Sequence, residues 1–149
     1  MPEGCVVDTS CLIVLDKVGL LSLLCEVYKV IYLPKSVVKE FGENLLPKCI
    51  RVIEVSSPLV RIFTDELNLG LGEAETIAYA YEQGMEAVID DAKARKVAQK
   101  LSVKLTGTIG ILIKAEKKGV IESSYQVVLK LKETGFRVSD DIVGKLKEK

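Results

Sequence analysis

The sequence predicts an α/β domain in which a mostly parallel sheet carries helices on both faces. Short apolar runs typical of buried strands alternate with stretches whose apolar residues recur at helical spacing. Acidic residues directly follow two of these runs: Asp8 follows Cys5-Val6-Val7, and Asp90-Asp91 follows Ala87-Val88-Ile89. The 149 residues contain no linker, repeat or low-complexity segment, so we expect one domain over residues 1–149.

The first half of the chain predicts three extended segments with helices between them. Thr9 or Ser10 is expected to cap the first helix, Gly19 to end it, and Pro34 to open a helix that carries Glu40 on its margin. The expected strands are residues 4–8, 29–33 and, as an edge or connecting strand, 51–55, and further short helices are expected over 20–26 and after Ser57-Pro58.

The second half predicts two more strands, at residues 86–89 and 103–106. A helix over 73–82 carries the apolar stripe Ala74, Ile77, Ala78 and Tyr81 and ends at Gly84. Further helices are expected over 92–101 and from Thr108 through Ile113, and the Lys-rich last third is expected to be helical.

Composition excludes several classes of site. The chain is formally neutral, so any contact with nucleic acid has to come from a local basic patch. The absence of histidine excludes Ser-His triads, His-ligated zinc and His general bases. Cys5, Cys11, Cys25 and Cys49 form no C-x-x-C pair, and we interpret them as small core residues in a reducing compartment.

Nothing in the sequence indicates export or insertion into a membrane. The N-terminus does not resemble a signal peptide, and the longest apolar run is far below the ~18 residues that a membrane span requires. We therefore expect a soluble cytoplasmic protein without a membrane partner.

Several carboxylates are placed where α/β sheets bind ligands, outside the carboxyl ends of the strands. Asp8 and Asp90-Asp91 follow strands, and Glu73 and Glu75 open a helix. Carboxylates that converge repel one another, and such sites are usually held together by divalent cations that prefer hard oxygen ligands. The adjacent pair is the strongest indication, because two carboxylates at the end of a buried strand are costly without a cation or a helix N-terminus. The pattern indicates a metal site and phosphate chemistry.

Each of these carboxylates also has a structural interpretation. Asp8 could cap the helix that follows it. Glu73 and Glu75 could interact with the helix macrodipole, with Glu75 as the N3 residue of a cap at Gly72, and a helical wheel does not separate the two. Glu40, taken alone, is an ordinary carboxylate of an amphipathic helix.

Basic and hydroxyl residues near the acidic pair allow two interpretations as well. The basic side chains are either a solvated helix face or contacts for a phosphodiester backbone. Thr106 and Thr108 are expected as turn and cap residues that could also hydrogen-bond a ligand. The basic residues concerned are Lys93, Arg95, Lys96, Lys100 and Lys104.

Four motifs, in order along the chain, resemble those of PIN domains. They are Val6-Val7-Asp8-Thr9-Ser10, Leu33-Pro34 with Val38 and Glu40, Gly72-Glu73-Ala74-Glu75, and Ile89-Asp90-Asp91. The chain more closely resembles the prokaryotic PIN-like branch related to VapC-type toxins. The marks of that branch include a tail similar to Gly135-Phe136-Arg137-Val138-Ser139-Asp140. The resemblance covers nearly the whole chain.

This resemblance implies a Rossmann-like α/β/α sandwich with a central, mostly parallel sheet of four or five strands, and a metal-dependent ribonuclease activity. One or two Mg²⁺ or Mn²⁺ ions would activate a water and neutralise the phosphodiester. The implied carboxylate ligands are Asp8, Glu40, Glu73 and Asp91, with Asp90 beside them. Many family members carry Asp where this chain has Glu73. The expected substrate contacts are Ser10, Thr108, Lys93 and Arg95.

The implied partners are RNA, a second copy of the chain in a homodimer and, if the protein is a toxin, an antitoxin protein. Two alternatives come from other classes. A non-catalytic PIN-like module would keep the fold and use its surface for protein contacts. A phosphotransfer domain of the dehalogenase type would need an Asp where this chain has Ser10, so we consider it the weaker alternative.

Overall fold

The computed structural model describes residues 4–42 and 46–148, and its centre is a parallel sheet. The order of the strands across the sheet is β3-β2-β1-β4-β5, and every neighbouring pair is parallel. This confirms the predicted α/β fold class. The strands are β1 (Gly4–Val7), β2 (Val30–Pro34), β3 (Ile50–Ile53), β4 (Glu86–Val88) and β5 (Leu105–Thr106).

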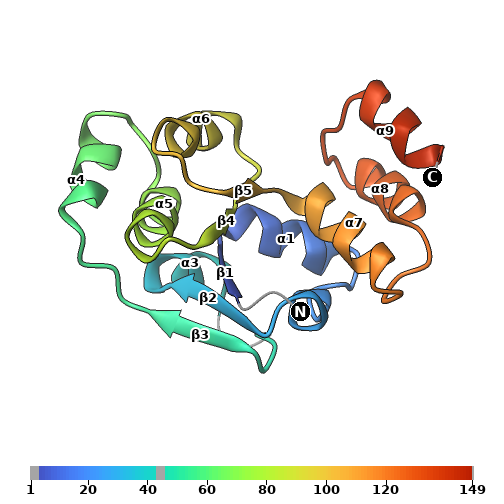
Figure 1. Cartoon of the computed structure of the whole chain (residues 1–149), viewed down its shortest axis with the longest axis horizontal. Helices are drawn as coiled ribbons and strands as arrows, with labels where there is room; N and C mark the ends of the chain where they lie inside the picture. The colour runs from blue at the N-terminus through green and yellow to red at the C-terminus, as the bar shows by residue number, and fades with distance from the viewer. Residues whose placement is uncertain (1–3, 43–45, 149) are drawn as a thin grey trace.

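Helices connect the strands and cover both faces of the sheet, as Figure 1 shows. Two of them, α8 and α9, follow the last strand's helix and lie at the opposite end of the molecule from α4. The helices are α1 (Thr9–Lys17), α2 (Leu23–Val27), α3 (Lys35–Phe41), α4 (Pro58–Asp65), α5 (Leu71–Gln83), α6 (Ala92–Lys100), α7 (Thr108–Lys117), α8 (Ser124–Glu133) and α9 (Asp140–Lys147).

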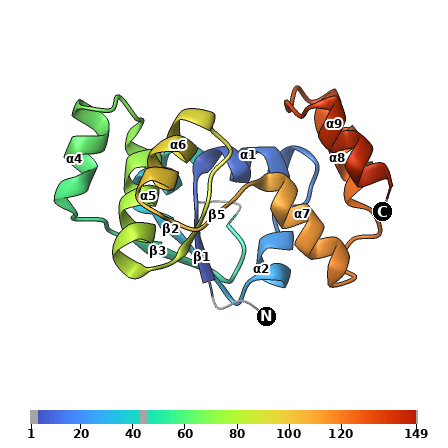
Figure 2. The same cartoon turned by 45° about the horizontal axis from the view of Figure 1, so that its top comes forward.

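Alternation along the central strands divides the core into two halves. Cys5 and Val7 pack into one cluster with residues of α1, α2 and α7, whereas Val6 packs into a second cluster with residues of α4, α5 and α6. Figure 2 shows these two sets of helices on opposite sides of the strands. Successive strand residues point to opposite faces, so a strand covered on both faces is apolar throughout. This explains the continuous apolar run at β1.

The path of the chain creates a reversal point between β1 and β4. From β1 the chain adds β2 and β3 on one side of the sheet, and then returns to add β4 and β5 on the other side. In open α/β sheets, ligands bind at such a point, outside the carboxyl ends of the strands. Asp8 and Asp90-Asp91 follow the two strands that flank it.

Several predicted boundaries and packing assignments differ from the structure. Asp8 is the N-cap of α1, which confirms its structural interpretation and replaces Thr9 or Ser10 as the expected cap. The fifth strand begins at Leu105, two residues later than predicted, and therefore has only two residues. The helix that was expected through Ile113, α7, continues to Lys117. Tyr81, predicted in the apolar stripe of α5, is 48% exposed, whereas the other members of that stripe, Ala74, Ile77 and Ala78, are fully buried.

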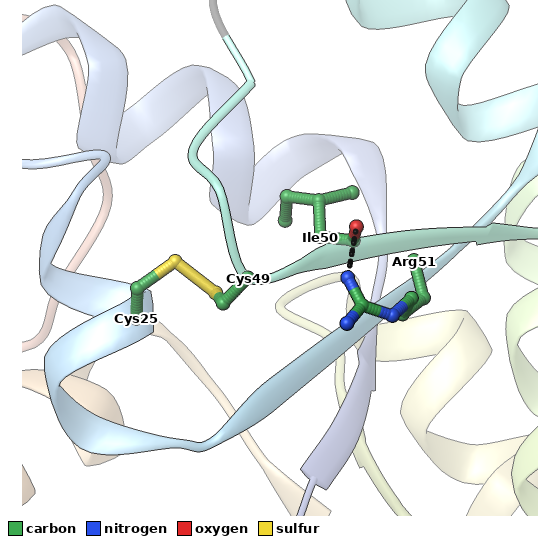
Figure 3. The surroundings of a disulfide bond; sticks show 4 residues. All are labelled: Cys25, Cys49, Ile50 and Arg51. Carbon is green, nitrogen blue, oxygen red and sulfur yellow. Dashed lines mark hydrogen bonds between the residues drawn. A yellow bond between two sulfur atoms is a disulfide. The ribbon is translucent and has the colours of Figure 1, made fainter.

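The interpretation of all four cysteines as core thiols is wrong for two of them. Cys25, in α2, and Cys49, next to β3, form a disulfide with a Cα–Cα distance of 5.6 Å, shown in Figure 3. Sequence spacing could not reveal this pair, because 24 positions separate the two residues and the fold brings them together. Cys5 and Cys11 are free and buried, as expected for core residues.

Across the residues that the structure describes, no helix is long and apolar enough to cross a membrane.

Candidate active site

Asp8 lies at the centre of the candidate site because β1 ends directly beneath it. Its backbone N–H continues the sheet by donating to the carbonyl of Val88, at 3.1 Å, which ties it to the neighbouring strand β4. Its Oδ1 accepts a hydrogen bond from the backbone N–H of Thr9, at 2.8 Å. Only 4% of the residue is exposed. Asp8 is therefore both a helix cap and a buried carboxylate at the reversal point.

Gly72 lets Glu40 of α3 approach Asp8. A Cβ atom at Gly72 would lie 2.7 Å from Oε1 of Glu40 and 3.6 Å from Oδ1 of Asp8. A side chain at position 72 would therefore collide with Glu40 and crowd Val37, whereas its Cβ would make only an ordinary contact with Asp8. A pocket of about 250 Å³ is lined by Asp8, Glu40 and Glu73 together.

Glu73 and Glu75 have different surroundings in the structure, although a helical wheel places them at comparable angles. Glu73 lines the pocket with Asp8, and its Oε1 accepts a hydrogen bond from the N–H of Gly70, at 3.1 Å. Glu73 is thus the N3 residue of a cap anchored at Gly70, whereas the predicted structural cap was Glu75 with Gly72. Glu75 turns to α3, where it accepts a hydrogen bond from the hydroxyl of Ser36.

Asp90 and Asp91 are adjacent in sequence but make different contacts. Both oxygens of Asp90 accept hydrogen bonds from Thr108: Oδ1 from the backbone N–H, at 2.8 Å, and Oδ2 from the hydroxyl, at 2.5 Å. Asp91 caps α6 through Oδ2, which accepts from the N–H of Ala94 at 2.9 Å. Thr108 therefore fixes the position of the Asp90 carboxylate through both of its oxygens. Asp91, in contrast, is exposed to solvent.

The electrostatics connect these carboxylates into one cluster. Burial raises the pKa of Asp8 to about 7, the Thr9 N–H opposes this, and the charges of Glu73, Glu40 and Asp90 raise it further. Burial also raises the pKa of Glu73, against the Gly70 N–H, and the nearby Asp91 carboxylate adds to the increase. Each pKa is raised because negative charge is concentrated where little water or positive charge offsets it. Five acidic side chains therefore influence one another here.

Two hydroxyl groups beside Asp8 have no hydrogen-bond partner among the described residues. They are Oγ1 of Thr9 and Oγ of Ser10, both buried as atoms. Ser10 also lines two pockets, the one that contains Glu73 and a second, of about 410 Å³, that contains Asp90 and Asp91. Buried hydroxyls are usually hydrogen-bonded, so an unpaired one that faces a pocket is available to a ligand.

The donor set suits a divalent cation such as Mg²⁺ or Mn²⁺. Carboxylate and hydroxyl oxygens are the hard ligands that these ions prefer, and the unpaired Ser10 hydroxyl adds a neutral oxygen. Within residues 4–42 and 46–148, however, no three acidic or cysteine side chains are arranged to hold one ion. Glu73, Asp90 and Asp91 each accept a hydrogen bond from a backbone N–H in this arrangement.

The expected basic contacts lie at the edge of the cluster. Nη1 of Arg95 donates to the carbonyl of Ile89, at 2.7 Å, and Nζ of Lys93 donates to the carbonyl of Asn68, at 3.1 Å. Arg95 also lines a third pocket, of about 490 Å³, with Asp90. The basic residues are thus attached to the backbone around the acidic cluster, while Thr108 is fully buried behind it.

Sequence analysis assigned no role to several residues that lie at these pockets. Gly72 stands directly before Glu73, but a sequence does not reveal which side chains approach a glycine. Lys17, Phe136 and Arg137 line the pocket that contains Asp90 and Asp91, although they come from the end of α1 and from the turn between α8 and α9. The tail motif that contains Phe136 was the available signal.

Comparison with known proteins identifies the family. A family model described as a PIN domain matches residues 4–149. A search of curated proteins finds no match. PIN domains are generally nucleases that need divalent metal ions. With nearly its whole length matched, this chain belongs to the PIN-domain family.

Proposed function

We propose that this protein is a metal-dependent endoribonuclease that hydrolyses RNA phosphodiester bonds. One observation carries the proposal: carboxylates from four separate segments converge at the reversal point of the sheet, and no lysine or arginine among the described residues lies within ion-pair distance of them. Uncompensated buried charge is costly for folding and is typical of functional sites.

The proposed ligands of Mg²⁺ or Mn²⁺ are Asp8, Glu40, Glu73 and Asp91, with Asp90 beside them. When bound, such an ion activates a water for attack on a phosphodiester and offsets the charge of the phosphate. Asp8 is oriented by the Thr9 N–H, so its position does not depend on the ion. Asp90 is oriented in the same way by Thr108.

Residues around the carboxylates supply the proposed contacts to substrate. Ser10 lines the pocket, and its hydroxyl has no hydrogen-bond partner among the described residues, so it is the proposed donor to a phosphate oxygen. Lys93 and Arg95, at the rim, offer positive charge to the phosphate backbone. Thr108 contributes indirectly, by holding Asp90 in place.

The biological setting follows from the resemblance to VapC-type toxins. We propose a single-stranded or structured RNA substrate that is cut to leave a 3′-hydroxyl, and a homodimer in the cytoplasm. In this setting the protein would be the toxin of a toxin-antitoxin pair, silenced by a protein antitoxin. The order and spacing of the four acidic motifs support the PIN-domain resemblance, and the tail similar to Gly135-Phe136-Arg137-Val138-Ser139-Asp140 supports the resemblance to the toxin-related branch.

Cleavage of a labelled single-stranded RNA with Mn²⁺ tests the proposal. Purified protein should cut the RNA, and both EDTA and Asp8→Asn should abolish cutting. Asp65→Asn is the matched control, because it removes an exposed carboxylate of α4 and should leave the rate unchanged. Folded protein that does not cut, or cutting that survives Asp8→Asn, would refute the nuclease. Such a result would favour the alternative function, a non-catalytic PIN-like interaction module.

A further inference from the structure

The turn between α8 and α9 places an aromatic ring and a cation beside the acidic cluster. Phe136 and Arg137 line both the pocket of about 410 Å³ and the pocket of about 490 Å³. Asp90 lines the same two pockets, so it lies between them. The turn comes from the far end of the sequence, and the nuclease site proposed above does not include it.

Local hydrogen bonds hold this turn in a defined conformation. Gly135 has a φ of +99°, which lets the chain reverse directly after α8. The N–H groups of Gly135 and Phe136 donate to the carbonyls of Lys132 and Leu131, each at 3.1 Å. The Phe136 ring packs partly on the core, so one part is anchored while another part borders the pockets. The aromatic surface is therefore preformed.

Positive charge at the same place has no partner within the described part of the chain. Arg137 is exposed and forms no hydrogen bond or ion pair there, and the same holds for Lys17, which lines the first pocket from the end of α1. Arg95 borders the second pocket. Three cationic side chains, Lys17, Arg95 and Arg137, therefore line the two pockets beside the carboxylates.

We propose that the α8–α9 turn is a binding subsite for single-stranded RNA, in which Arg137 and Lys17 contact phosphates and Phe136 stacks on a base. Grooves for single strands combine cations along the backbone with aromatic rings that stack on bases, and this is the combination that the two pockets present. Ser10 lines both the carboxylate pocket and the first of these pockets, so the two adjoin at this residue, between the site of cutting and the turn. The inference rests on the proposed ribonuclease function and adds the strand's path to it.

The binding of a fluorescent single-stranded RNA tests the subsite without requiring cleavage. Binding is measured by anisotropy with Ca²⁺ in place of Mn²⁺, and the RNA is checked for integrity afterwards. Arg137→Ala should weaken binding several-fold and reduce the slope of log K against log salt by about 0.7, the value for one phosphate contact on a single strand. Phe136→Leu keeps the apolar packing but removes the stacking ring, so it should weaken binding about tenfold and leave the salt slope unchanged.

Arg61→Ala is the matched control, because Arg61 is an exposed arginine of α4, at the opposite end of the molecule (Figure 1). Binding that responds to Arg137→Ala and Phe136→Leu no more than to Arg61→Ala would overturn the subsite, and so would RNA that does not bind the wild-type protein. Equal competition by DNA of the same sequence would overturn the assignment to RNA. A protein that binds RNA through this turn but does not cut it would refute the proposed nuclease while leaving the subsite intact.

Discussion

Two clusters of polar side chains, each with at least one carboxylate, lie at opposite ends of β4, and they differ in whether a cation pairs with the carboxylate. At the start of the strand, Glu86 accepts a hydrogen bond from the hydroxyl of Tyr28, at 2.6 Å, and forms an ion pair with Lys114, at 3.0 Å. Beyond the end of the strand, Asp90 and Asp91 join Asp8 and its neighbours, with no lysine or arginine of the described residues within ion-pair distance.

The difference indicates which cluster serves the fold and which serves function. Lys114 also bonds to the hydroxyl of Tyr28, at 2.7 Å, so all three side chains of the first cluster satisfy one another. Burial and the Glu86 carboxylate raise the pKa of Tyr28, which keeps it a hydrogen-bond donor. A polar network that includes its own cation stabilises a core, whereas clustered carboxylates that accept hydrogen bonds but have no cation beside them are typical of functional sites.

Neutralising Asp8 should have the largest effect on stability. The unfolded chain loses the Asp8 proton near pH 3.8, and the folded protein keeps it until about pH 7. The folded state therefore binds more protons in this window, and its stability falls as the pH rises. Without metal, Asp8→Asn should be more stable than wild type at pH 8 by on the order of 4 kcal/mol, and equal to it near pH 3.5.

Urea denaturation in EDTA across this range measures the difference. Asn retains the ability to cap α1, so the cap does not confound the comparison. Parallel stability curves for the two proteins would show that the charge at Asp8 is already compensated, and the contrast between the two clusters would fail.

Mn²⁺ should stabilise the protein through the second cluster alone. At about 100 times its dissociation constant, an ion that binds only the folded state adds about 2.7 kcal/mol, or roughly 5–10 °C in the melting temperature of a chain of this length. Differential scanning fluorimetry should show this increase for wild type and for Lys114→Met. An equal increase in Asp8→Asn would place the ion elsewhere.

Removing the cation of the first cluster should destabilise the fold. Lys114→Met leaves the buried Glu86 carboxylate and the Tyr28 hydroxyl without their shared donor, and should cost about 2 kcal/mol at pH 7. Urea denaturation checks this. The rate of RNA cleavage per folded molecule should not change, and a large loss of rate would mean that this cluster also serves function.

The smallest effect on stability is expected from Gly72→Ala, which acts on the geometry of the site. The new Cβ would lie 2.7 Å from Oε1 of Glu40, whose exposed side chain can turn away from Asp8. We expect a stability change within about 1 kcal/mol and a loss of cleavage of at least tenfold. Gly144→Ala in α9 is the control, because nothing lies within 4 Å of its new Cβ. Equal activity of both variants would argue against a role for Glu40.

Much of the fold could be predicted because local patterns reflect it directly. The continuous apolar run at β1 indicates a strand covered on both faces, and all five strands and their parallel arrangement agree with the prediction. The predicted start of a helix was less accurate where several neighbouring side chains can cap it. At α1, for example, Asp8 is the N-cap in place of Thr9. Tyr81 was misassigned because periodicity indicates a face, but not how far the partner elements extend over it.

The acidic positions could be predicted from sequence, but their contacts could not. Glu73 and Glu75 are equivalent on a helical wheel, but in the structure Glu73 lines the pocket that contains Asp8, whereas Glu75 contacts Ser36 of α3. The assignment of these residues as metal ligands stays a prediction for the experiments above.

The sequence by itself determined the α/β class, the carboxylates and their location at strand ends, because these depend on the order of residue types along the chain. Only the tertiary structure decided the disulfide between Cys25 and Cys49, the approach of Glu40 past Gly72, and the placing of Phe136 and Arg137 beside Asp90. Each of these joins segments far apart in sequence. Their separation is set by how the helices pack on the sheet, which no local pattern of residues encodes.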